Sequence, residues 1–286
     1  MEKVTLTIGS PVQFQQVSPG QSLHVGGYAT GTGGAEPHTI ENVTVQVDDQ
    51  TPVKAKLVLL PRHPGHLQDP PAYLFSLDLQ VTGDPGTHEI LVRATDDSNV
   101  TAAKGVSVLL GLDTWTFYGL VTLTTDSHDY PGPYSSSFTS ILAFSRDLTR
   151  AELITMGAVQ FTIPTGTIFG DDTATANLES SGSGTFDASS GNISIPSVAF
   201  HVTHSISAGG EQDFTLDPLS TTAPGGSPLN QSTGDLTLVG GPSKFHGGAL
   251  DGTSASVVFK GTAHKVTTIH HPPLPLPTVP TTKTTS

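Results

Sequence analysis

One ten-residue pattern occurs twice in the second half of this chain. Residues 186–195 read FDASSGNISI and residues 229–238 read LNQSTGDLTL. In each copy an Asp or Asn begins a turn by bonding to its own backbone, a Gly supplies a positive φ angle, and apolar and polar residues then alternate. The pattern predicts a hairpin turn followed by a strand with one apolar face. The second half is therefore expected to consist of antiparallel strands.

Composition extends this expectation to the whole chain. The 286 residues suggest about two domains, and they include 31 Gly and 22 Pro but only 13% charged residues. Such usage is typical of short strands joined by many turns. The sequence contains no apolar run long enough to span a membrane as a helix. We therefore predict an all-β protein that does not span the membrane.

Net charge and cysteine content exclude several classes of partner and of chemical site. The net charge is −13, and no cluster of cations is present to bind phosphates, so we expect no nucleic-acid partner. The absence of Cys excludes a disulfide framework, a thiolate metal site and a Cys nucleophile. The first residues enter a strand pattern without a signal segment, which leaves an exported protein with its signal removed or a cytoplasmic protein. We expect a secreted or cell-surface protein.

Residues 1–111 are expected to form an immunoglobulin-like β-sandwich. Seven short segments of strand character are separated by turns rich in Pro, Gly and Asp. The segments are Val4–Ile8, Leu23–Ala29, Ile40–Val47, Ala55–Leu60, Tyr73–Leu79, His88–Ala94 and Ala102–Leu109.

Two stretches of this region carry a family resemblance. Residues 40–49, IENVTVQVDD, and residues 85–97, PGTHEILVRATDD, resemble bacterial Ig-like and fibronectin type III-like accessory modules of secreted proteins. The resemblance covers most of residues 4–110. It implies an Ig-like sandwich, and such modules usually act as spacers or docking surfaces, often beside secreted glycoside hydrolases.

Two groups in this region offer metal ligands. Asp96, Asp97 and Asn99 lie in one loop, and their carboxylate and amide oxygens would suit calcium. The alternative is a polar turn between two strands. His63 and His66 flank a Pro-Gly turn and would offer two imidazoles to a metal, or would simply be exposed loop residues.

Residues 112–263 are expected to form a second β domain that packs closely on the first, because no long linker separates them. A long antiparallel meander with few edges favours a closed or nearly closed barrel, and a second sandwich is the alternative. The expected strands are Trp115–Thr124, Ser137–Phe144, Leu153–Ile163, Thr173–Leu178, Ser183–Phe186, Asn192–Thr203, Gln212–Leu216, Asp235–Val239, Lys244–Leu250 and Ser254–Gly261.

Phenylalanines are spread over these strands and are expected in the core of the second domain, which would also have room for a small apolar ligand. They are Phe117, Phe138, Phe144, Phe161, Phe169, Phe186, Phe200, Phe214 and Phe245.

The loop of residues 126–134, DSHDYPGPY, looks most like a binding site. Tyr rings stack on sugar faces and carboxylates bind hydroxyls, so the loop predicts a carbohydrate site. An ordered loop that covers one end of the domain is the alternative. The candidate ligand-binding residues are His128, Asp129, Tyr130, Tyr134 and Trp115.

Histidines in the second domain suggest a weaker candidate site, in which His and carboxylate side chains would bind a metal. His201 and His204 are three residues apart in a predicted strand, so they point to opposite faces. His246 would approach one of them. No strand-turn-helix nucleophile motif, P-loop or dinucleotide fingerprint occurs.

The preferred function is noncatalytic binding of a ligand or surface outside the cell, with carbohydrate as the expected ligand. The alternatives are a small β-barrel enzyme with a His and Asp site in its second domain, and a self-associating structural subunit. Residues 264–286 are rich in Pro and Thr and are expected to be an extended, mobile tail. This tail resembles linkers between modules of secreted polysaccharide-active enzymes.

Overall fold

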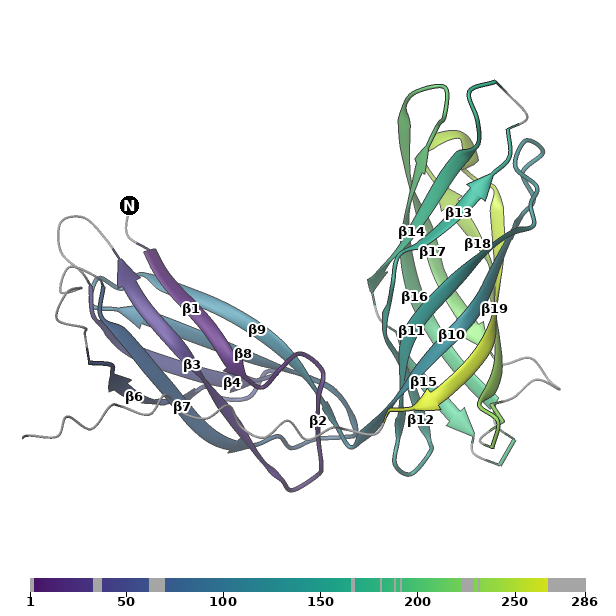
Figure 1. The fold of residues 1–286 in the computed structure, drawn as a ribbon. Helices are drawn as coiled ribbons and strands as arrows, with labels where there is room; N and C mark the ends of the chain where they lie inside the picture. Colours follow the sequence, from purple (N-terminus) through teal and green to yellow (C-terminus); the bar gives the residue numbers. More distant parts are fainter. Residues whose placement is uncertain are drawn as a thin grey trace, which may run out of the picture.

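The computed structural model describes residues 3–32, 38–61, 70–165, 168–180, 182–187, 189–190, 192–222, 229–230 and 232–266. Regular structure in this part of the chain consists of strands and one short 3₁₀ helix, η1 (Gly248–Leu250), which confirms the all-β prediction. A β-sandwich and a β-barrel stand end to end (Figure 1). The predicted turn with His63 and His66, and residues 267–286 of the predicted tail, lie outside the described residues. Residues 264 and 265, also predicted as tail, belong instead to the last strand, Ser254–Lys265.

The first 110 residues form two sheets that face each other. One sheet has the order β1 (Lys3–Ser10), β3 (Ser22–Thr32), β7 (Ala72–Gln80) and β6 (Lys56–Leu59). The other has the order β2 (Gln15–Val17), β9 (Thr101–Leu110), β8 (Gly86–Asp96), β4 (Ile40–Val47) and β5 (Val53–Lys54). All seven predicted strands are present, and β2 and β5 are additional.

Alternation of apolar and polar residues builds the sandwich core as predicted. Val43 and Val45 of β4 pack with Ile90 and Val92 of β8, and Phe75 of β7 fills the space between the sheets without any exposed surface. Side chains of successive strand residues point to opposite faces, so the intervening polar residues remain at the surface.

From residue 112 onward the chain forms a closed barrel. Its strands are β10 (Leu112–Thr125), β11 (Tyr134–Ser145), β12 (Arg150–Met156), β13 (Val159–Ile163), β14 (Asp172–Ser180), β15 (Gly182–Asp187), β16 (Asn192–Ser205), β17 (Glu211–Thr222), β18 (Asp235–His246) and β19 (Ser254–Lys265). Most strands pair antiparallel with a neighbour in sequence, β12 pairs with β15, and β10 pairs with β19 to close the ring. Strands β13 and β14 extend β12 and β15 along the barrel wall, and β14 also pairs with β16.

The first and last barrel strands approach closely where two glycines face each other. Gly119 of β10 pairs with Gly261 of β19. A Cβ atom on Gly261 would lie 2.0 Å from the Tyr118 carbonyl oxygen, far inside van der Waals contact. The absence of a side chain at both positions therefore permits this close approach of the two strands.

Phenylalanine side chains fill the barrel, as the sequence predicts, with one exception. Eight of the nine predicted core phenylalanines are buried, and Phe138 contacts both Phe117 and Phe259 edge to face. Phe169 is wrongly predicted, because it lies in the loop after β13 with 63% of its surface exposed. It follows the strand rather than belonging to it, so no inward-facing position holds it.

The two copies of the repeated pattern lead into β16 and β18. Asp187 accepts hydrogen bonds from the Ser189 amide at 2.9 Å and from the Ser190 hydroxyl at 2.6 Å. Asn230 accepts from the Ser232 amide at 2.9 Å in the second copy. Both turns are thus closed by a side chain that bonds to the backbone two residues later.

Two predicted strand boundaries are wrong. Lys244–Leu250 is not a separate strand, because β18 continues through an irregularity at residues 240–243 and ends at His246. The predicted strand Leu153–Ile163 is divided between β12 and β13 at residues 157–158. A β-bulge accounts for the first error, since it interrupts the pairing without ending the strand.

Sandwich and barrel meet directly through one residue. Gly111, with a φ angle of 65°, joins the end of β9 to the start of β10. A small apolar cluster covers the junction and contains Leu109, Leu112, Ala143 and Ile154, with Phe14 and Ile141 packed against it. In this part of the chain no helix has the length and apolar character needed to cross a membrane.

Candidate functional site

A polar cleft lies at the junction of sandwich and barrel and has a volume of about 460 Å³. Typical ligand sites measure roughly 300–1,000 Å³ and occur often between domains, so this cleft has a suitable size and position. It is lined by residues 84–88 of the sandwich, Arg150 and Glu152 of β12, and Gly182 and Ser183 of β15.

Glu152 is the central acidic group of the cleft. Its carboxylate accepts a hydrogen bond from the Thr87 hydroxyl at 2.7 Å, so it joins barrel to sandwich. The alternation of β12 turns Ala151 and Leu153 into the barrel and Glu152 outward, yet Glu152 is only 6% exposed. The sandwich therefore covers it. A carboxylate offers about four acceptor positions, and Thr87 occupies one of them.

Arg150 supplies hydrogen-bond donors beside this carboxylate. Its Nη1 atom donates to the carbonyl oxygen of Pro85 at 2.6 Å, which is a second contact between barrel and sandwich. A guanidinium carries five N–H donors in a rigid plane, so one bond to Pro85 leaves donors for a ligand. Within the described residues no ion pair joins Arg150 to Glu152.

His88 borders the cleft from the sandwich side and is held in place at both ring nitrogens. Nδ1 lies 2.7 Å from Asp48 Oδ2, and Nε2 lies 3.0 Å from the Asp84 carbonyl oxygen. Ser183 is the register partner of Glu152 on the neighbouring strand β15, and it is exposed. The lining of the cleft thus includes hydrogen-bond donors and acceptors, with one guanidinium from Arg150 and two carboxylates from Asp84 and Glu152.

The predicted binding loop lies at the opposite end of the barrel, between β10 and β11. His128 and Asp129 are exposed at its tip. Tyr130 and Tyr134 are half-buried, and Tyr130 meets the ring of His204 edge to face at 5.6 Å. Burial raises the pKa of the Tyr134 hydroxyl. The tyrosine rings therefore close the barrel end instead of forming an open platform.

A buried pair of ionisable groups lies beneath this loop. His204 Nε2 is 3.2 Å from Asp172 Oδ2, and the backbone amide of Ser207 donates to Asp172 Oδ1 at 2.8 Å. This amide bond, followed by the side chains of Ser207 and His204, holds the pKa of Asp172 below its usual value. The adjoining apolar cavity measures only about 30 Å³, which is too small for any substrate.

The barrel interior likewise has little free space. Two further apolar cavities along its axis measure about 20 and 40 Å³. A small apolar ligand would therefore have to displace core side chains.

Trp115 lies at the junction end of β10, half-buried against Phe144 at 5.7 Å. Since β10 runs the length of the barrel, Trp115 is not part of the group formed by the tyrosines of the predicted loop.

The other histidines of the barrel lie apart from this pair. As predicted from their spacing, His201 and His204 point to opposite faces of β16. His201 contacts Asp213 at 3.2 Å on the outside, and His204 is buried inside. His246 contacts Asp217 at 2.8 Å. Each histidine is thus matched with its own aspartate rather than gathered around one centre.

The predicted calcium ligands come together only in part. Asp96 and Asp97 form a group with His38, in which one ligand atom of each residue lies within 4.8 Å of the others. Asn99 is exposed, adopts a left-handed conformation with φ 64°, and donates its backbone amide to the Asp96 carbonyl at 3.0 Å. It therefore serves the turn and is replaced in the group by a histidine.

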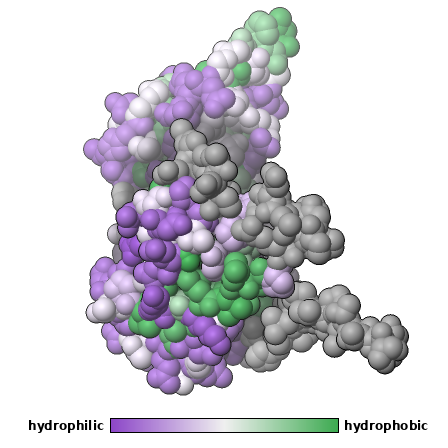
Figure 2. All heavy atoms as spheres, turned by 90° about the vertical axis from the view of Figure 1, so that its left-hand side faces the viewer, coloured by the Kyte–Doolittle hydropathy of each residue, from purple (hydrophilic) through white to green (hydrophobic). Residues whose placement is uncertain are grey.

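Figure 2 shows the sandwich from its outer side, with an apolar patch framed by hydrophilic residues. The edge strand β6 contributes two exposed apolar side chains, Val58 and Leu59, to the outer surface of the sandwich. An edge strand with exposed apolar side chains is a surface at which another chain could pair, and self-association stays a prediction.

The chain matches no protein-family model and no curated protein. Function therefore has to be argued from the cleft and the side-chain groups themselves.

Sequence reasoning missed the cleft because its two halves are far apart in the chain. Thr87 and Glu152 are separated by 65 positions. One local signal was present: Leu153 and Ile154 are consecutive apolar residues in a predicted strand. A strand covered on one face alternates, so two apolar residues in succession indicate that part of its outer face is covered too.

Proposed function

We propose that this protein is a noncatalytic binding protein of the cell exterior, which holds a hydroxyl-rich ligand of the carbohydrate class in the junction cleft. The observation that carries the proposal is the combination of volume and lining in this cleft. Among the cavities described above, only the junction cleft has the volume of a ligand site, and acceptors and donors line it together.

The chemistry of the lining favours a neutral ligand with many hydroxyls. Glu152 offers acceptors, Arg150 offers donors, and Ser183 offers both. A hydroxyl group both donates and accepts, so it can satisfy carboxylate and guanidinium side by side. A simple anion would meet Glu152, and a simple cation would meet Arg150, with repulsion in each case.

Secretion is part of the proposal and is supported by the Thr-rich, weakly charged composition and by the resemblance of the sandwich to accessory modules. Catalysis is not part of it. The buried His204–Asp172 pair would be the centre of an enzyme, but a cavity of about 30 Å³ beside it gives no substrate access.

The test begins with a glycan array probed with the full chain, followed by calorimetric titration of the best binder. Ser183→Trp would fill the cleft from an exposed position that makes none of the described contacts between sandwich and barrel. We expect it to weaken binding at least tenfold, which corresponds to about 1.4 kcal/mol. Ser137→Trp, an identical change at an exposed position of β11, should leave the affinity unchanged.

Two results would sink the proposal. No binding to any glycan would remove the ligand class. Binding that survives Ser183→Trp but is lost in Asp129→Ala would move the site to the predicted loop at the far end of the barrel.

A further inference from the structure

The turn between β8 and β9 has a buried carboxylate at its base. Positions 90, 92 and 94 of β8 face the sandwich core, and Asp96 continues this inward series with no exposed surface. One oxygen, Oδ1, accepts the backbone amides of Ser98 and Val100, each at 2.9 Å. The side chain thereby closes the turn, as aspartates do at strand ends.

The second carboxylate oxygen of Asp96 has no such partner. Oδ2 is buried and lacks a hydrogen bond within the described residues. A buried polar atom that has lost its hydration without gaining a partner is costly, and a charged one more so. Such an atom calls for a ligand that supplies positive charge.

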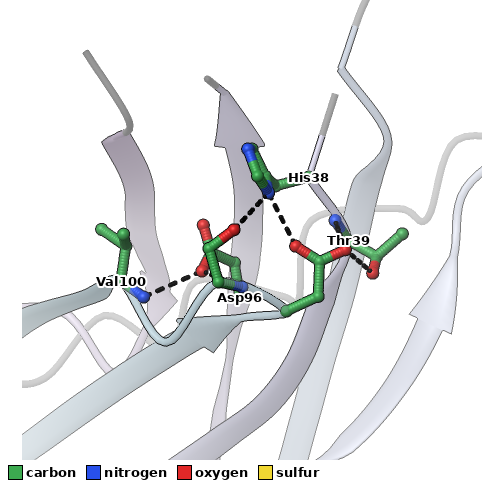
Figure 3. Close-up of polar contacts among 6 residues, drawn as sticks. His38, Thr39, Asp96 and Val100 are labelled. Atoms are coloured by element: carbon green, nitrogen blue, oxygen red, sulfur yellow. Dashed lines mark hydrogen bonds and ion pairs between the residues drawn. The ribbon is translucent and has the colours of Figure 1, made fainter. Parts of the chain in front are cut away.

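Two more ligand groups face this carboxylate from the surface side. His38 precedes β4, and its Nδ1 lies 2.7 Å from Asp97 Oδ1 and 2.7 Å from Ser98 Oγ. Asp97 is fixed in turn by Thr39, whose amide and hydroxyl donate to Oδ2 at 3.1 and 2.8 Å. Figure 3 shows His38, Asp96 and Thr39 gathered around this point, where the start of β4 meets the turn after β8.

The geometry points to a binding site for a divalent transition-metal ion, with Zn²⁺ as the representative ion, formed by His38, Asp96 and Asp97. One ligand atom of each lies within 4.8 Å of the others, so a small contraction would bring all three to the 2.0–2.2 Å bond lengths of zinc. Half-buried His38 and partly exposed Asp97 leave a path from solvent, and water would complete the coordination.

The ligand types decide between zinc and the calcium expected from the sequence. Calcium prefers six to eight oxygen ligands, whereas imidazole nitrogen suits zinc and its neighbours in the first transition series. Thr39 holds Oδ2 of Asp97 with two hydrogen bonds, so the other carboxylate oxygen, Oδ1, is kept beside His38. The ion would take the place of the hydrogen bond between His38 Nδ1 and Asp97 Oδ1.

The test is calorimetric titration of the chelator-treated full chain with ZnCl₂ and, separately, with CaCl₂. We expect a zinc site of one ion per chain that His38→Gln and Asp97→Asn each weaken at least tenfold. Both side chains reach the surface, so these variants should fold, which far-ultraviolet circular dichroism checks. Asp96 is left unchanged because its Oδ1 closes the turn.

A matched control is available on the same sandwich. His24 Nδ1 lies 2.7 Å from Asp78 Oδ1, as close as His38 lies to Asp97, but no third ligand completes that pair in the described part of the chain. His24→Gln should leave the zinc site intact. Absence of zinc binding, an affinity unchanged in both His38→Gln and Asp97→Asn, or tighter binding of calcium than of zinc would each overturn the inference.

Discussion

Truncation of Ile154 should loosen the junction between sandwich and barrel. This residue points outward from β12, yet it is only 5% exposed because Leu109 and Phe14 of the sandwich cover it. Ile154→Ala removes three buried carbon groups at about 0.8 kcal/mol each, or roughly 2.4 kcal/mol in total. Core truncations of this kind cost about 2–5 kcal/mol, and an open junction that can partly collapse should lie near the lower end.

Urea unfolding of the full chain measures the loss of stability, and small-angle X-ray scattering measures the arrangement of the two parts. Ile154→Ala should lower the unfolding free energy by about 2–3 kcal/mol and broaden the distribution of distances between sandwich and barrel. Leu120→Ala is the matched control, because Leu120 also points outward from the barrel but is 60% exposed. It should change stability by less than about 0.5 kcal/mol. Equal effects of the two variants would show that the sandwich does not cover Ile154.

Two further predictions concern the barrel itself. Gly261→Val would place a side chain 2.0 Å from the Tyr118 carbonyl oxygen, so β10 and β19 would have to separate. Thermal denaturation should show a loss of unfolding free energy above about 4 kcal/mol. A near-native melting temperature would contradict the close pairing of these two strands. Asp172→Asn would weaken the bonds from Ser207 and His204 by about 1.5–3 kcal/mol. Because the pKa of Asp172 is lowered in the folded state, ionised Asp172 stabilises the fold above the ordinary pKa of 3.8. This stabilisation is lost as the pH falls through the folded pKa. The unfolding free energy of Asp172→Asn should therefore depend less steeply on pH in the acid range.

The sequence predicted the strands well because their pattern is local. Alternation along β4 and β8 named the buried valines of the sandwich, and the two matched turns named the strands β16 and β18. Most barrel strands pair with a neighbour in sequence, so a meander could be expected without knowledge of distant contacts. Avoidance of exposed edges favoured its closure, which the pairing of β10 with β19 provides.

The sites could not be predicted in the same way, because their members meet across the fold. His38 and Asp97 are 59 positions apart, and no spacing rule joins them. Asp96 could be named as a ligand from its loop, but its burial follows from the inward series of β8, which continues one position beyond the apolar residues. The aromatic character of Tyr130 and Tyr134 is visible in the sequence, whereas their packing against the end of the barrel core depends on the fold.

At the junction cleft, the register of β12 combines a local apolar pattern with a contact between segments far apart in the sequence. Ala151 and Leu153 must face the phenylalanine core, so Glu152 between them must face outward. A shift of one residue would place the carboxylate in the core and two apolar side chains in the cleft, which the core would oppose strongly. The apolar pattern therefore fixes the direction of Glu152, while the single-residue connection at Gly111 determines that Thr87 meets it. A change in the length of that connection should consequently disrupt the cleft while leaving the barrel strands paired.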